Sequence, residues 1–198
     1  MAPRRSEASV RRRWAAVLAL CLGVMMAFVN ITATVSALAA IQTDLHTSPS
    51  QLVWISSAYS LLVVSVVMSA GTLGDLAGRR LVFTIGALVF AAGSAMAVAA
   101  GSTGVLIAAE AIMGLGGAAV LPTSLSIVSH NFTDPQVRTV AISVWAAFSG
   151  IGLAVGPVLA GVLLTHFSWH AVFVPNVILG VIVLVATAVP TAVFVRRR

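Results

Sequence analysis

The chain has 198 residues, of which 60% are hydrophobic and only 8% are charged, and its mean hydropathy is +1.08. A soluble globular domain is about 45–50% apolar and about 25% charged, so this composition excludes an ordinary water-soluble fold and favours a lipid bilayer as solvent. The formal net charge is +6, carried by arginines without any lysine. These arginines lie at the chain ends and in short connections, a pattern that indicates membrane topology and argues against nucleic-acid binding.

Six apolar segments are long enough to span a bilayer. At 1.5 Å per residue, about 20 helical residues cross a hydrocarbon core of about 30 Å. The connections are short, which predicts antiparallel neighbours, and no segment alternates as a transmembrane strand would. The predicted fold is therefore all-α: a polytopic membrane protein with a six-transmembrane-helix bundle. In chain order, the predicted spans are Trp14–Ala40, Leu52–Thr72, Leu81–Ala100, Val105–Val128, Val140–Leu164 and Ala171–Val195.

The arginines fall on one side of this topology. They occur before the first span, after the second, after the fourth and after the last, and the opposite connections contain none. The positive-inside rule then predicts a multi-pass membrane protein with both termini in the cytoplasm. We expect the membrane to be the plasma (inner) membrane. The predicted organisation is a basic cytoplasmic segment at 1–13, a six-helix transmembrane domain at 14–195 and a basic cytoplasmic tail at 196–198.

A glycine-rich segment with one acid and two bases follows the second span. It reads Gly71-Thr72-Leu73-Gly74-Asp75-Leu76-Ala77-Gly78-Arg79-Arg80. Glycines permit close approach at a tight helix–loop–helix junction, and an acid four residues before an arginine can pair with it. The segment is similar to the signature loop of the major facilitator superfamily. This resemblance implies a gating loop; the simpler alternative is topology-setting charge. The predicted gating residues are Gly71, Gly74, Asp75, Gly78, Arg79 and Arg80.

The resemblance covers about residues 14–195 and matches one six-helix half of a major facilitator of the drug:proton antiporter branch, which contains fourteen-helix multidrug efflux proteins. It implies the fold of that half, with two inverted three-helix repeats. Two further motifs, each near the start of a predicted helix, also resemble this branch. They are Gln51-Leu52-Val53-Trp54 followed by Tyr59, and Phe167-Ser168-Trp169 followed by Phe173 and Asn176.

A third motif lies in the fifth span, which reads Gly152-Leu153-Ala154-Val155-Gly156-Pro157 and continues to Gly161. Gly152 and Gly156 form a GxxxG packing face, and Pro157 removes a backbone donor and bends the helix. The string resembles the antiporter motif, which implies that these residues prevent proton leak. Helix packing is the alternative explanation. The predicted motif residues are Gly152, Gly156, Pro157 and Gly161.

Several positions depart from the family pattern, and two of them place polar side chains in predicted spans. Asn30, followed by Thr32, stands where the branch has an acid in the first helix, and Glu110 stands where the family has arginine in the fourth. Glu110 is the only acid within a predicted span, and a charge there costs about 2.5–3.5 kcal/mol on insertion scales. We expect Asn30, Thr32 and Glu110 to line a proton or substrate cavity, with Glu110 as the titratable group. In the alternative, Glu110 reaches interfacial water and the other two pack against a neighbouring helix.

The chain contains no Walker loop, no H-E-x-x-H and no G-x-S-x-G motif, so we expect no enzymatic activity and no bound metal. We expect no cofactor; a proton gradient is the driving force that the resemblance implies. The implied function is efflux of drugs or other small molecules by proton-coupled antiport, in split or truncated form. The expected partners are the lipid bilayer, a small-molecule substrate, and a second six-or-more-helix half or a homodimer partner. The altered acid and arginine positions favour an alternative, a non-transporting remnant or an accessory subunit of a full transporter.

Overall fold

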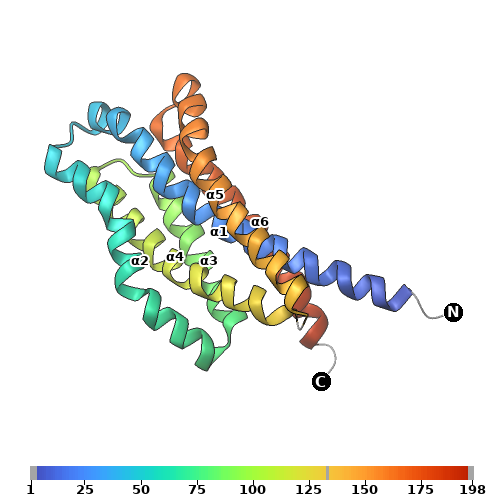
Figure 1. Ribbon diagram of the computed structural model, residues 1–198. Coiled ribbons are helices and arrows are strands. Elements are labelled where there is room, and N and C mark those ends of the chain that lie inside the picture. Colours follow the sequence, from blue (N-terminus) through green and yellow to red (C-terminus); the bar gives the residue numbers. More distant parts are fainter. Residues whose placement is uncertain (1–3, 133, 196–198) are drawn as a thin grey trace.

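The computed structural model describes the backbone of residues 4–132 and 134–195, and side chains between residues 14 and 187. The two predicted arginine-rich ends therefore lie outside the residues whose side chains are described. Every regular element in the described part is helical (Figure 1). In chain order the elements are α1 (Arg4–Leu45), α2 (Pro49–Ala77), α3 (Arg79–Val98), α4 (Thr103–Asn131), α5 (Pro135–His166), the 3₁₀ helix η1 (Trp169–Phe173) and α6 (Val174–Val195).

Local sequence signals set the ends of several helices. Ser48 caps α2 through a capping box, in which its hydroxyl accepts the Gln51 N–H at 3.4 Å and Gln51 Oε1 accepts the Ser48 N–H at 2.9 Å. Pro49 and Pro135 open α2 and α5, where a missing N–H costs no helical hydrogen bond. Gly78 separates α2 from α3 with φ +103°, a conformation that only glycine adopts without steric cost.

Six helices in the described part are long and apolar enough to cross a membrane, which confirms the predicted bundle. Two predicted boundaries are wrong. The third span ends at Val98 rather than two residues later, because Ala99 leaves the helical conformation. The sixth span begins in η1, not in a regular α-helix: Pro175 has no N–H to donate, and the Val174 N–H bonds to the Ala171 carbonyl in the 3₁₀ pattern.

The two central helices are α1 and α4. Helix α4 packs against α2 and α3, α1 packs against α5 and α6, and α1 and α4 contact each other (Figure 1). If α1, α2 and α3 are exchanged with α4, α5 and α6, respectively, these same pairs of helices are in contact. Two inverted three-helix repeats require this symmetry. The start of α1 and the end of α6 lie at the same end of the bundle, since the number of spans is even. Helices α2 and α5 have the smallest buried shares of the six.

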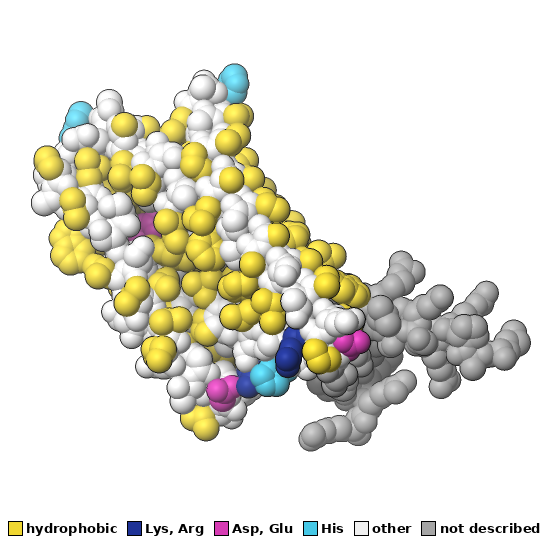
Figure 2. All heavy atoms as spheres, in the orientation of Figure 1, with side chains coloured by type: hydrophobic (Ala, Val, Ile, Leu, Met, Phe, Trp, Pro, Cys, Tyr) yellow, Lys and Arg dark blue, Asp and Glu magenta, His cyan; other side chains and the backbone are white. Residues whose placement is uncertain are grey.

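The sides of the bundle are apolar, and the arginines with described side chains lie at one end. Figure 2 shows hydrophobic side chains along the flank, with the arginine side chains visible in that view gathered at the lower end. On α2, Val64, Met68 and Leu76 are 75%, 81% and 82% exposed. Such side chains would be a liability in water, but lipid tails are as apolar as they are. The chain is therefore a multi-pass membrane protein.

Candidate functional site

Four polar side chains form a hydrogen-bonded chain inside the bundle, here called the Glu110 network. Asn30 and Thr34 on α1 both donate to Glu110 on α4, from Asn30 Nδ2 to Oε2 at 3.0 Å and from Thr34 Oγ1 to Oε1 at 2.8 Å. Asn176 on α6 donates from Nδ2 to Asn30 Oδ1 at 2.9 Å. All four residues are only 1–3% exposed. The network thus joins three helices and is closed to both water and lipid.

Glu110 has no basic partner within this network. In the part of the chain with described side chains, the ion pair found joins Asp75 to Arg79, in a different region. Tyr59 on α2 interacts electrostatically with Glu110, and its hydroxyl donates to the Ala27 carbonyl at 3.3 Å. A buried carboxylate is costly unless hydrogen bonds or a proton compensate its charge. The geometry therefore suits a carboxyl that is held by two donors when ionised and that can take up a proton.

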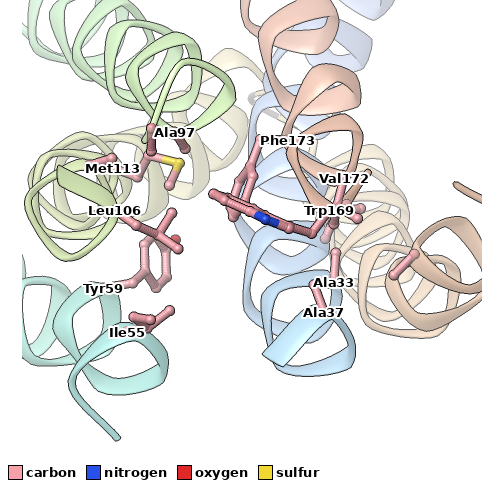
Figure 3. Close-up of a cluster of buried hydrophobic side chains, with 14 of the residues drawn as sticks. Ala33, Ala37, Ile55, Tyr59, Ala97, Leu106, Met113, Trp169, Val172 and Phe173 are labelled. Carbon is pink, nitrogen blue, oxygen red and sulfur yellow. The ribbon is translucent and has the colours of Figure 1, made fainter. Parts of the chain in front are cut away.

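A hydrophobic cluster encloses the network. Figure 3 shows Tyr59 and Met113 on one side of this cluster, and Trp169 and Phe173 of η1 on the other. The indole N–H of Trp169 donates to Asp44 Oδ2 at 2.8 Å, which ties η1 to the end of α1. The bundle is therefore closed over the network at the end opposite the start of α1.

The three residues predicted to line a cavity are not all together. Asn30 and Glu110 meet, and both are enclosed in the bundle rather than facing an open cavity or interfacial water. Thr32 instead faces α5, where its hydroxyl occupies the space that a Cβ on Gly156 would take, and it bonds to the Phe28 carbonyl of its own helix at 3.4 Å. Helical residues two apart differ in direction by about 200°, so Asn30 and Thr32 cannot share a face.

Thr34 and Asn176 belong to the network but were not among the predicted cavity residues. Thr34 lies four residues after Asn30, and this spacing puts the two on one helix face. That signal could have identified Thr34 from the sequence. Asn176 was noted only for its motif resemblance, because its contact with Asn30 depends on how α6 packs against α1.

The junction between α2 and α3 is shorter than the predicted loop. Gly78 alone separates the helices, since the leucine and alanine before it continue α2. Gly74 is buried against α4, where a Cβ would lie 2.9 Å from Thr123 Cγ2. Arg79 donates from Nε to Asp75 Oδ1 at 2.9 Å, and its Nη2 lies 2.8 Å from the same oxygen. The predicted acid–base pair is thus formed, one turn apart across the junction.

A pocket of about 910 Å³ lies beside this junction. It brings together five of the six predicted gating residues with side chains from the ends of α4 and α6. Gly71, the sixth, is not in its lining; a Cβ at this position would lie 3.8 Å from Pro122 Cβ on α4. The lining residues are Gly74, Asp75, Gly78, Arg79, Arg80, Leu81, Thr84, Ile127, His130, Asn131 and Thr187.

The predicted antiporter-motif residues serve two different faces of α5. Gly152 and Gly156 are buried against α1, and a Cβ on Gly152 would lie 2.8 Å from the Met25 carbonyl oxygen. Pro157 and Gly161 are exposed, and no atom lies within 4 Å of a Cβ built on Gly161. The first pair explains the close α1–α5 packing, whereas the second leaves a free helix face.

A helical bundle of inverted repeats with a buried carboxyl at its centre has the architecture of a secondary transporter. Residues 20–198 match the Major Facilitator Superfamily, and the chain belongs to this family. It is 39% identical to the multidrug efflux pump LfrA of Mycolicibacterium smegmatis over 162 residues, which are 82% of this chain and 32% of that protein.

Two further relatives have similar coverage. The chain is 39% identical to the drug efflux pump JefA of Mycobacterium tuberculosis over 173 residues, which are 87% of this chain and 34% of JefA. It is 37% identical to the tetracenomycin C resistance and export protein of Streptomyces glaucescens over 175 residues, which are 88% of this chain and 32% of that protein. The chain thus spans about a third of the length of the curated relatives it matches.

Proposed function

We propose that the chain takes part in proton-coupled efflux of drugs or other small molecules across the plasma membrane. The observation that carries this proposal is Glu110, a carboxyl 1% exposed, held by Asn30 and Thr34. An ionisable group inside a span is a functional candidate, and proton uptake relieves the cost of burying its charge. The relatives named as drug efflux pumps support efflux as the process and small molecules as the cargo.

The proposed orientation has both termini in the cytoplasm, supported by the arginine asymmetry of the sequence. The Asp75–Arg79 pair then lies at the cytoplasmic face and braces the α2–α3 junction as part of a gate. Glu110 is seven residues from the start of α4, about 10 Å along the helix axis, and so lies in the outer half of the membrane. Protons from outside reach it when η1 moves away from the end of α1.

The proposed transport unit contains further helices that cover α2 and α5. Val64 and Met68 on α2 are 75% and 81% exposed, and Val158 and Val162 on α5 are 65% and 58% exposed. These two helices are equivalent in the two repeats, so in a symmetric pair α2 of one copy would pack against α5 of the other. We propose that these helices come from a second half of six or more helices or from a second copy of this chain.

A second candidate function is that of an accessory membrane protein that binds a full transporter without transporting by itself. Asn30 favours it, because an amide at this position cannot carry the proton of the acid that the family resemblance implies there. The intact pair of Asp75 and Arg79 favours the transport function instead.

The test is efflux from cells that lack their own pumps and express the chain alone or with a candidate partner half. Glu110→Gln keeps nearly the size of the side chain and, like the protonated carboxyl, offers one acceptor oxygen and one donor group, but it cannot exchange a proton. We expect gradient-driven efflux to fall at least about tenfold in this variant, equivalent to about 1.4 kcal/mol. Ser94→Ala is the control, since it also removes a buried polar group, one that bonds to the Phe90 carbonyl on α3.

Unchanged gradient-driven efflux in a normally inserted Glu110→Gln variant would refute the proposed proton carrier. Absence of efflux from the stably inserted parent chain, with and without partner halves, would refute transport and favour the accessory function.

A further inference from the structure

Asn176 has an unused hydrogen-bond acceptor deep in the bundle. Its side chain is 1% exposed and donates through Nδ2 to Asn30, but its Oδ1 has no hydrogen-bond partner among the described residues. Buried polar atoms in native proteins are nearly always paired, so an exception in an otherwise satisfied network requires an explanation.

The hydrogen bonds of the Glu110 network all point in one direction. Asn176 donates to Asn30, Asn30 donates to Glu110, and Thr34 donates to the other carboxyl oxygen of Glu110. This direction suits an ionised carboxylate, which can only accept. Once Glu110 is protonated at Oε2, its O–H needs an acceptor, but Asn30 presents its Nδ2 donor to that oxygen while its Oδ1 faces Asn176.

We propose that Asn30 and Asn176 form a reversible amide relay, with Asn176 as the positioning residue that acts through Asn30. When a proton binds Glu110 at Oε2, both amide groups turn over. Asn30 Oδ1 then accepts the Glu110 O–H, and Asn30 Nδ2 donates to Asn176 Oδ1, the atom that is free in the ionised state. A primary amide exchanges its donor and acceptor by such a half-turn with almost no change in shape.

The relay keeps two hydrogen bonds among its three side chains in both protonation states of Glu110. It therefore lets one enclosed site hold the proton and release it without leaving the carboxyl unsatisfied. A fixed donor in place of Asn176 would favour the ionised state alone. The inference rests on the proposed function, in which Glu110 exchanges a proton.

Few other groups face the carboxyl. Helix α1 contributes Asn30 and Thr34, and α6 contributes Asn176, all uncharged. Helix α2 contributes the phenol of Tyr59, whose O–H donates to the Ala27 carbonyl of α1 at 3.3 Å. Helix α3 faces this part of α4 with apolar side chains and Ser94, whose hydroxyl bonds to the Phe90 carbonyl of its own helix and contacts the Met113 sulfur on α4. We therefore assign the uptake of the proton to Glu110 and the reorientation of the amide groups to Asn30 and Asn176.

The test is infrared difference spectroscopy of the whole chain in lipid vesicles, between neutral and acidic pH. The chain has three asparagines, so isotopic labelling of their side-chain carbonyls in an Asn131→Gln background reports on Asn30 and Asn176 alone. We expect acidification to produce a protonated-carboxyl band that Glu110→Gln lacks. The labelled amide carbonyl bands should shift over the same pH range, because hydrogen-bond partners are exchanged at both asparagines.

In Asn176→Leu, we expect the protonated-carboxyl band to remain but at a different frequency. The labelled carbonyl band of Asn30 should no longer shift over the pH range in which that carboxyl band appears. Ser94→Ala should leave both signals as in the parent. If Asn176→Leu does not fold, the spectrum of the labelled parent is sufficient as a test. Amide bands that stay constant while Glu110 is protonated would overturn the relay but would not contradict the proposed function. A coupled shift alongside unaltered efflux in Glu110→Gln supports the relay and refutes the proposed function. If acidification produces no protonated-carboxyl band that depends on Glu110, the relay is overturned.

Discussion

Gly116 lies where α3 and α4 approach closely, six residues or about 1.7 turns after Glu110 on α4. A Cβ on Gly116 would lie 2.6 Å from the Gly86 carbonyl oxygen, 2.6 Å from the Phe90 nitrogen and 2.8 Å from Phe90 Cα. These are backbone atoms of α3, so no side-chain rotation relieves the overlap and the two helices must separate. Overpacking costs about 1–3 kcal/mol, and Ala regains about 0.5–1 kcal/mol over Gly in a helix. The gain offsets part of the cost, so we expect Gly116→Ala to lower the free energy of unfolding by about 1 kcal/mol.

The control is Gly104→Ala on the same helix, where no atom lies within 4 Å of the added Cβ. We expect that variant to be neutral or up to about 1 kcal/mol more stable, because only the helix propensity changes. The measurement is reversible denaturant unfolding in lipid–detergent bicelles, followed by tryptophan fluorescence. Equal stability of Gly116→Ala and Gly104→Ala would refute the inference that backbone contact holds α3 against α4.

Two further predictions concern the network and the α2–α3 junction. Thr34→Val removes a 2.8 Å hydrogen bond to Glu110 at nearly constant shape. Interhelical hydrogen bonds in membranes contribute about 0.6 kcal/mol on average and at most about 1.7 kcal/mol, so the initial efflux rate of Thr34→Val should fall about 3- to 20-fold. The control Thr34→Ser keeps the hydroxyl, and its rate should be close to that of the parent. Asp75→Asn breaks the ion pair with Arg79, but Asp75 is 62% exposed, so the free energy of unfolding should change by no more than about 0.5 kcal/mol while efflux falls. A loss of stability above about 1 kcal/mol would contradict a gating role that is separate from folding.

The structure brings two positions that depart from the family pattern, 30 and 110, into direct contact. The resemblance implies an acid at position 30 and a base at position 110, and the chain has Asn30 and Glu110 instead. Because these side chains are hydrogen-bonded at 3.0 Å, a carboxyl on either helix occupies the same region of the bundle.

Features that depend on local sequence were predictable. The six spans follow from the length of each apolar run, and the sharp α2–α3 junction follows from Gly78, which alone permits the φ of +103° observed there. The Asp75–Arg79 pair follows from its spacing of four residues. In each case the controlling interactions act within a few residues, so they can be read along the chain.

Features that depend on helix orientation were not predictable in this way. Asn30 and Thr32 are neighbours in sequence, yet one meets Glu110 and the other faces Gly156 on α5. The apolar composition obscures these faces, because in a membrane the lipid-facing and core-facing sides are equally hydrophobic. The periodicity that marks the buried face of a soluble helix is therefore weak here.

By itself, the sequence determined that this protein resides in a bilayer and how many helices cross it, because bilayer thickness and backbone hydrogen bonding impose those features on any apolar chain. Only the tertiary structure decided that Asn176, far along the chain, would complete the site of Asn30 and Glu110. That contact is set by the packing of three helices at once, and no local rule of length, capping or spacing specifies it.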